Sequence, residues 1–250
     1  MKTIDGFKDK IICGDCLDVM KEIPDRSIDM ILCDLPYGVT QNREDKTLDL
    51  TLLWTQYLRI IKDKGIIVLT SQFPYTLDLI NGNRRYFRYD LIWDKHLTSG
   101  FLNSNRMPLR KHEHLLVFYK RLGKYNPQFM AGKPLHSKGI SYMDKEHKNN
   151  NYGHFDMVDD SRAGSTSKYP VSIISIPKSH PSKALHPTEK PVRLAEYLIS
   201  TYTDVGDIVL DNCIGTGWTA VACKHLSRHF IGIDISRAYC DMSEQRLMDS

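Results

Sequence analysis

Residues 207–234, DIVLDNCIGTGWTAVACKHLSRHFIGID, decide the fold. The apolar run at 207–211 predicts a buried strand, 216–226 predicts a helix, and 228–234 predicts a second strand. Two glycines, Gly215 and Gly217, stand where the first strand passes into the helix, and Asp234 ends the second strand. Strands that alternate with helices in this way indicate a parallel sheet covered on both faces.

The same alternation extends outward to both ends of the chain. Further strands are expected at 10–13, 28–34, 65–70, 86–93, 114–119 and 171–176, and further helices at 48–61, 191–202 and 236–247. Between Lys120 and about Tyr169 the periodicity is lost, and a stretch this long without regular structure is usually functional or mobile. The sequence therefore predicts an α/β fold with a doubly wound, mostly parallel sheet and one irregular insert.

The glycine turn and the acidic strand end together predict a nucleoside site. Glycine lets the backbone turn tightly beside a ligand, and ligands bind beyond the carboxyl ends of strands in such sheets. Asp234 is placed to accept hydrogen bonds from ribose hydroxyls. Trp218 and Thr219 stand where a dinucleotide-binding loop has its third glycine, so a nucleoside without a pyrophosphate fits better. A plain tight turn remains the alternative.

The strand at 28–34 ends in Asp34-Leu35-Pro36-Tyr37. The Asp34 carboxylate and the Leu35 carbonyl, held by the rigid bond to Pro36, are two acceptors suited to the two N–H groups of an amine on an aromatic ring. Holding both N–H groups favours a more tetrahedral nitrogen and frees its lone pair. The face of the Tyr37 ring, rather than its hydroxyl, is expected to stack on a base. An ordinary turn after a strand would contain the same residues.

Taken in order, these motifs resemble those of the amino DNA methyltransferases, which modify adenine N6 or cytosine N4. Asp34 to Tyr37 is similar to their catalytic tetrapeptide, 211–217 to their cofactor loop, and 186–191 (HPTEKP) to the segment before that loop. Residues 14–17 and 23–29 match their N-terminal segment, and 93–95 and 112–114 resemble later motifs. The resemblance covers about 1–120 and 180–250.

The resemblance implies S-adenosyl-L-methionine as cofactor and a sheet of the type found in methyltransferases that use it. Asp34, Leu35, Pro36 and Tyr37 are the implied catalytic residues. Asp15 is expected near the adenine amine of the cofactor, Asp234 at its ribose, and Thr188 and Lys190 at its methionine end. No metal is implied. The full set of implied cofactor-binding residues is Asp15, Thr188, Lys190, Asp211, Asn212, Cys213, Gly215, Gly217 and Asp234.

The order of the motifs resembles the permuted beta group, with the catalytic motif before the cofactor loop. It implies a catalytic half at 1–119, a target-recognition insert at 120–183 and a cofactor-binding half at 184–250. Two positions depart from the family pattern: Leu35 replaces a proline, of which only the carbonyl is needed, and Cys213 replaces a phenylalanine. Asp34, rather than serine, favours adenine N6 as the target.

Charge agrees with a DNA partner. Residues 95–190 carry sixteen Lys or Arg and seven Asp or Glu, a net charge of +9, whereas the rest carries −5. A basic middle suits a polyanion such as double-stranded DNA, although a solvated basic surface would look the same. The six cysteines are typical of buried thiols in a reducing cytoplasm, and no apolar run is long enough for a membrane span. The resemblance implies a bacterial or phage-encoded protein.

Several alternatives stay open at this stage. They are a cytosine-N4 methyltransferase, an RNA or protein-amide methyltransferase, and a catalytically dead DNA-binding module. Homodimerisation and a companion restriction endonuclease are consistent with the resemblance, but the residues decide neither.

Overall fold

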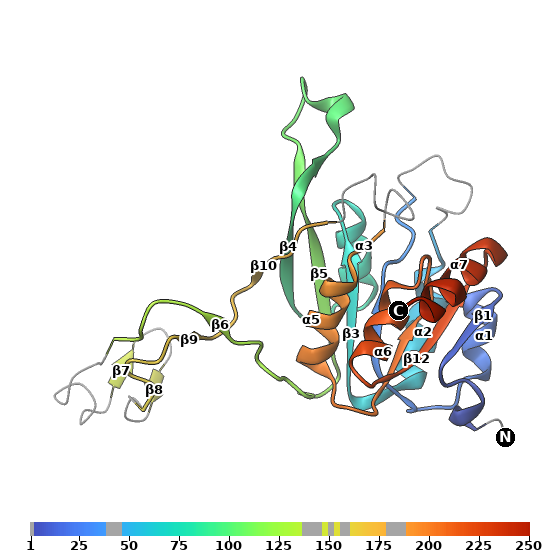
Figure 1. The fold of residues 1–250 in the computed structure, drawn as a ribbon, viewed down its shortest axis with the longest axis horizontal. Helices are drawn as coiled ribbons and strands as arrows, with labels where there is room; N and C mark the ends of the chain where they lie inside the picture. Colours follow the sequence, from blue (N-terminus) through green and yellow to red (C-terminus); the bar gives the residue numbers. More distant parts are fainter. Residues whose placement is uncertain (1–2, 39–46, 137–146, 150–152, 156–160, 179–188) are drawn as a thin grey trace. The chain divides into compact units, whose positions relative to one another are not determined.

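In the computed structural model, one eight-stranded sheet organises the chain (Figure 1). The structure describes residues 3–38, 47–136, 147–149, 153–155, 161–178 and 189–250. Within the sheet only β5 runs antiparallel to its neighbours, so the predicted doubly wound, mostly parallel sheet is confirmed. In spatial order the strands are β1 (Lys10–Cys13), β12 (His229–Asp234), β11 (Ile208–Asp211), β2 (Ile28–Cys33), β3 (Ile61–Ser71), β5 (Arg110–Phe118), β4 (Phe87–Ser99) and β10 (Ile173–Ser175).

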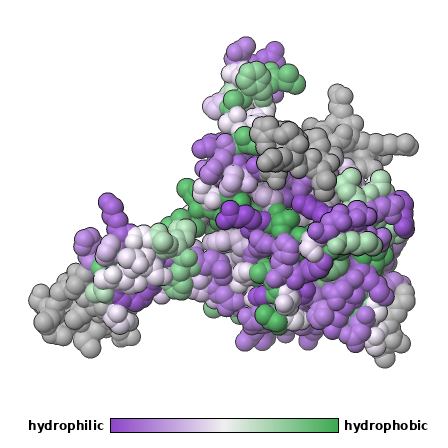
Figure 2. Space-filling view, viewed as in Figure 1, coloured by the Kyte–Doolittle hydropathy of each residue, from purple (hydrophilic) through white to green (hydrophobic). Residues whose placement is uncertain are grey.

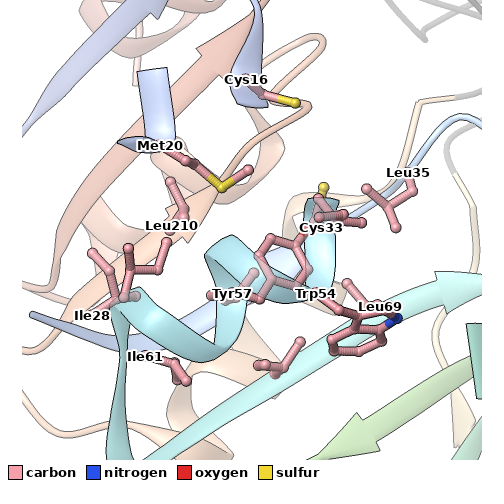
Figure 3. Close-up of a cluster of buried hydrophobic side chains, with 14 of the residues drawn as sticks. Cys16, Met20, Ile28, Cys33, Leu35, Trp54, Tyr57, Ile61, Leu69 and Leu210 are labelled. Atoms are coloured by element: carbon pink, nitrogen blue, oxygen red, sulfur yellow. The ribbon is translucent and has the colours of Figure 1, made fainter. Parts of the chain in front are cut away.

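Two helical layers cover the sheet because its central strands are apolar on both faces. In β2, Ile28, Ile31 and Cys33 pack into one core, whereas Met30 and Leu32 pack into the other. The first core, shown in Figure 3, is closed by helices from the N-terminal half, and the second by helices from the C-terminal half. The helices are α1 (Cys16–Glu22), α2 (Leu50–Ile60) and α3 (Tyr75–Gly82) on the first side, and α5 (Val192–Tyr202), α6 (Trp218–His225) and α7 (Arg237–Met248) on the second.

Side-chain caps define where two of these helices begin. Asp15 accepts a hydrogen bond from the Leu17 amide at 2.8 Å, and Asp49 accepts from the Thr51 amide at 2.8 Å. Each carboxylate satisfies an amide that the first helical turn leaves without a partner. Helices α1 and α3 were not expected from the sequence, because seven or eight residues show too little of the helical period. Two short 3₁₀ helices are also present, η1 (Ile4–Gly6) before β1 and η2 (Phe101–Asn103) between β4 and β5.

The hairpin formed by β4 and β5 is longer than the pattern of apolar residues predicts. Apolar alternation indicated strands at 86–93 and 114–119, whereas the strands run to Ser99 and from Arg110. Residues 96–108 are all exposed, so the backbone ladder rather than burial holds the extension together. A pattern that records burial cannot detect it.

Residues 127–171 form a second compact unit. It contains two short antiparallel pairs, β6 (Met130–Ala131) with β9 (Ser167–Lys168) and β7 (His147–Asn149) with β8 (Gly153–Phe155). This unit is shorter than the expected insert at 120–183, because residues near both ends of that range belong to the larger unit. At one end, Lys120 donates to the Leu58 carbonyl at 2.7 Å and Asn126 to the Thr203 carbonyl at 3.1 Å. At the other end, β10 joins the eight-stranded sheet.

No helix in the described parts of the chain is both long and apolar enough to cross a bilayer.

Candidate active site

Asp34 lies at the carboxyl end of β2, beside the end of β3. The register pairs Cys33 with Leu69, which makes Asp34 and Thr70 neighbours. One oxygen, Oδ1, accepts hydrogen bonds from the Tyr37 hydroxyl at 2.9 Å and from the Thr70 hydroxyl. The Tyr37 and Thr70 hydroxyl oxygens lie 2.7 Å apart, so one of the two hydroxyl protons is shared between Asp34 and the neighbouring hydroxyl. The predicted catalytic carboxylate is therefore fixed in orientation by two hydroxyl groups.

The second Asp34 oxygen is held by a lysine from the other half of the chain. Lys190 Nζ lies 2.6 Å from Asp34 Oδ2, and only 6% of the lysine side chain is exposed. Lys190 also forms an ion pair with Glu113 at 3.3 Å, and Glu113 pairs with Lys95 at 3.2 Å. These four residues make an alternating chain of charges, Lys95–Glu113–Lys190–Asp34, in a largely buried setting.

Attraction between neighbouring opposite charges keeps these buried side chains ionised. Burial opposes the ammonium, but Asp34 and Glu113 outweigh it and raise the pKa of Lys190. Burial also opposes the Glu113 carboxylate, yet Lys190 and Lys95 hold its pKa below the ordinary value. Breaking one member of such a buried set leaves an uncompensated charge, so the set acts as a unit.

Tyr37 combines a half-buried ring with a bonded hydroxyl. Its ring centroid lies 5.6 Å from that of Tyr75 and 5.8 Å from Lys190 Nζ. Burial raises the pKa of the Tyr37 hydroxyl well above its usual range, so it remains a donor. The expectation that only the ring face matters is incomplete, because the hydroxyl also orients Asp34. Leu35 packs into the first core, which explains why an apolar side chain can replace proline there.

The loop from Asp211 to Gly217 joins β11 to α6 and turns through two left-handed residues. Gly215 has φ +52° and Gly217 has φ +81°, and a Cβ at Gly217 would come 3.2 Å from Ser243. The buried Asp211 carboxylate fastens this loop by accepting from the Thr219 hydroxyl at 2.6 Å and from the Cys213 amide at 3.1 Å. Burial raises the pKa of Asp211 to about 7 against these hydrogen bonds.

The remaining predicted members of this loop differ in where they point. The buried Asn212 amide accepts from the Tyr57 hydroxyl and donates to the Cys16 thiol at 3.5 Å, so its side chain serves the core. Cys213 is half-buried beside it. Thr188 lies outside the described residues.

Asp234 ends β12, and Asp15 follows the end of the neighbouring strand β1. Asp234 accepts from the Gly215 amide at 2.9 Å and from the Ser236 amide at 2.9 Å, which fixes its carboxylate. Cys13 is the register partner of Asp234, and the exposed Asp15 follows two residues later. Two carboxylates beside a glycine turn fit a nucleoside with its hydroxyl and amino groups. No group of three metal-binding side chains occurs in the described ranges.

Sequence reasoning missed Thr70, Lys95 and Glu113, which support Asp34 directly or through Lys190. Thr70 lies near the carboxyl end of β3, adjacent to β2, and the convergence of carboxyl ends could have identified it. Lys95 and Glu113 belong to segments 93–95 and 112–114, which the sequence marked without a role. Their pairing depends on the β4–β5 register, which no local pattern reveals.

Known proteins resemble this chain in sequence and in fold. A family model described as DNA methylase, N6_N4_Mtase, matches residues 28–245. The type II methyltransferase M.HpaI of Haemophilus parainfluenzae is 26% identical over 95% of this chain and 74% of its own length. The M1.HpyAVI–SAM complex has a TM-score of 0.61 at 21% identity, covering 95% of this chain and 99% of that one.

A second solved structure broadens the range of target bases within this fold. The PvuII DNA methyltransferase, named as cytosine-N4-specific, has a TM-score of 0.64 at 15% identity and covers 96% of this chain and 89% of that one. Likeness at this level concerns the fold, whereas the family model spans nearly the whole sequence. The chain belongs to the DNA methylase family of N6 and N4 amino-methyltransferases.

Proposed function

We propose that the chain methylates N6 of adenine in double-stranded DNA, with S-adenosyl-L-methionine as donor. Methylation of an amino group in DNA follows from the family, and the choice of adenine is our proposal. The observation that carries it is the Asp34 carboxylate, held at a strand end by Tyr37, Thr70 and Lys190. An aspartate here, rather than the serine of the usual cytosine-type tetrapeptide, favours adenine.

The catalytic residues bind and orient the amine. Asp34 and the Leu35 carbonyl accept the two N–H groups of the base, so that the nitrogen lone pair is free to form the new N–C bond. When bound, S-adenosyl-L-methionine supplies an electrophilic methyl group and takes up the electron pair of the broken S–C bond. The positive nitrogen then loses one proton along its hydrogen bond to Asp34, from which the proton passes to solvent. No cysteine needs to attack, because the amine is the nucleophile.

Lys190 belongs to this carboxylate rather than to the methionine end of the cofactor. Its ammonium donates a hydrogen bond to Asp34 Oδ2 and also forms an ion pair with Glu113. Groups already aligned before the reaction stabilise a transition state without reorganisation. We therefore assign Lys190, Glu113 and Thr70 to positioning of Asp34.

The cofactor-binding role rests on the second cluster of strand ends. We assign Asp234 to the ribose hydroxyls and Asp15 to the adenine amine, and Gly215 and Gly217 to the close approach of the backbone. Asp211 and Asn212 support the loop from below through Thr219 and Tyr57.

Target recognition is assigned to the second unit, 127–171, within the expected insert. Arg162 lies 4.9 Å from the Phe129 ring and 4.3 Å from the Tyr169 ring, and both rings are exposed. Such arginine–aromatic groups suit base stacking and phosphate contact. The type II names of the relatives support a companion restriction endonuclease and a site of action in the bacterial cytoplasm. A homodimer is also part of the proposal, by analogy with the beta group.

Analysis of the product tests the target base. DNA incubated with the enzyme and methyl-labelled cofactor is digested to nucleosides and separated. We expect the label in N6-methyldeoxyadenosine. Label in N4-methyldeoxycytidine would show that the target base is cytosine and not adenine. Label only in added RNA or protein would contradict DNA as the substrate.

A further inference from the structure

The end of the β4–β5 hairpin forms an exposed arm, residues 96–110. Ser71 of β3 pairs with His114, and His114 pairs with Ile92 of β4, so these three residues are level across the sheet. Strand β5 extends four residues from His114 to Arg110, which pairs with Ser99 of β4 across an irregular stretch. At about 3.3 Å per residue, the paired strands reach roughly 13 Å beyond the end of β3. Because β4 is parallel to β2, the arm extends beyond the strand ends where Asp34 lies. Figure 1 shows the β4–β5 hairpin projecting past the other strands of the sheet.

The tip of the arm is apolar, and its side chains remain exposed when the described residues are considered. Leu102 is 100% exposed, Phe101 77% and Met107 50%. Figure 2 shows the apolar tip beside hydrophilic groups at the end of the projection. The turn is shaped by Gly100, with φ +85°, and by the 3₁₀ helix η2. Large apolar side chains held in solvent by a defined turn indicate a surface that another molecule covers.

The charge beside these side chains selects the partner. From 96 to 112 the chain carries Arg106, Arg110 and Lys111 and no carboxylate. Among the described residues Arg106 forms no ion pair, whereas Lys111 lies 3.6 Å from Asp94. Three apolar side chains on a hairpin tip are far short of the roughly 800 Å² per partner of a stable protein interface. A basic arm with a small apolar tip therefore suits a nucleic acid better than a second copy.

If the target amine binds at Asp34, the enzyme must move the base out of the duplex, and an inserted arm could assist this step. A base amine inside a duplex cannot reach a carboxylate recessed at a sheet edge, so the base must leave the stack. Proteins that open or kink a duplex often insert apolar side chains between its bases. We propose that the arm enters the duplex beside the target base, with Phe101 and Leu102 in the base stack and Arg106 on a phosphate. This rests on the proposed DNA-methylating function.

The experiment compares two duplexes that contain the sequence methylated by the wild-type enzyme. In one the target is paired, and in the other an abasic position lies opposite it, so that less pairing and stacking opposes extrusion. The double variant Phe101→Ser/Leu102→Ser is expected to transfer methyl at least about 10-fold more slowly to the paired duplex. On the abasic duplex its rate is expected to come within about threefold of wild type.

The control is Val205→Ser, which removes another exposed apolar side chain (71%) that precedes β11, at the opposite ends of the strands from the arm. It should leave both rates unchanged. Arg106→Gln should reduce the slope of log affinity against log salt by about one.

Three results would overturn the proposal. They are an unchanged rate of the double variant on the paired duplex, an equal loss on both duplexes, and a loss that accompanies conversion of a wild-type dimer to a monomer. Wild-type transfer to the paired duplex establishes the proposed function separately from the arm. Its absence would overturn both.

Discussion

Lys190 Nζ lies 2.6 Å from Asp34 Oδ2, which joins the segment before α5 to the end of β2 across 156 positions of sequence. Residues far apart in the sequence thus meet at the carboxylate that we propose binds the target amine. The contact supports a role for Lys190 in positioning Asp34, in place of the expected role at the methionine end of the cofactor.

The first prediction distinguishes these roles. Lys190→Gln should lower kcat at least about 10-fold, because Asp34 loses a charge-assisted hydrogen bond. S-adenosyl-L-methionine affinity, measured by calorimetry, should change little. Lys21→Gln, which removes an exposed lysine of a surface pair, is the control for loss of charge. Lost cofactor affinity with normal kcat would return Lys190 to the methionine end.

A second prediction concerns the two parts of Tyr37. Tyr37→Phe keeps the ring but removes the hydroxyl that orients Asp34, so kcat should fall with little change in the KM for DNA. Tyr37→Ala should also raise that KM, since base–aromatic stacking contributes roughly 1–3 kcal/mol. Steady-state kinetics on one duplex check both. A normal kcat for the Phe variant would show that Thr70 and Lys190 suffice to orient the carboxylate.

Asp234 should govern cofactor binding. Asp234→Ala removes the carboxylate proposed for the ribose hydroxyls and the acceptor of the Gly215 amide. Hydrogen bonds to a charged group contribute roughly 1.5–3 kcal/mol, so the Kd should rise by about 10-fold or more. Calorimetry that finds the wild-type Kd would mean that the nucleoside site is elsewhere.

The raised pKa of Asp211 predicts a pH dependence of stability. Its folded pKa, about 7, lies above the usual value of 3.8, so the folded state binds the proton more tightly. This contribution is fully present below the unfolded pKa and is lost as pH rises through 7. The free energy of unfolding should therefore fall less between pH 5 and pH 8 in Asp211→Asn than in wild type. Urea denaturation at both pH values checks this, and equal falls would contradict the assignment.

The sequence predicted the sheet and both clusters of strand-end residues because burial and chain turns leave local patterns. Asp34, Asp234 and the glycines stand at strand ends, where any doubly wound sheet gathers its ligand-binding groups. Glu113 could not be placed in the same way, since its contact with Lys190 depends on the register of the antiparallel β5. The arm escaped prediction because its strands are exposed and carry no pattern of burial.

The central claim is that Asp34 acts on the target amine and not on the cofactor. Single-turnover transfer from labelled S-adenosyl-L-methionine to a DNA duplex, measured for wild type and Asp34→Ala with cofactor affinity determined on the same samples, tests it most directly. The account predicts a rate loss of about 100-fold or more with the cofactor Kd nearly unchanged. Near-normal transfer by Asp34→Ala, or a rate loss explained entirely by weaker cofactor binding, would contradict it.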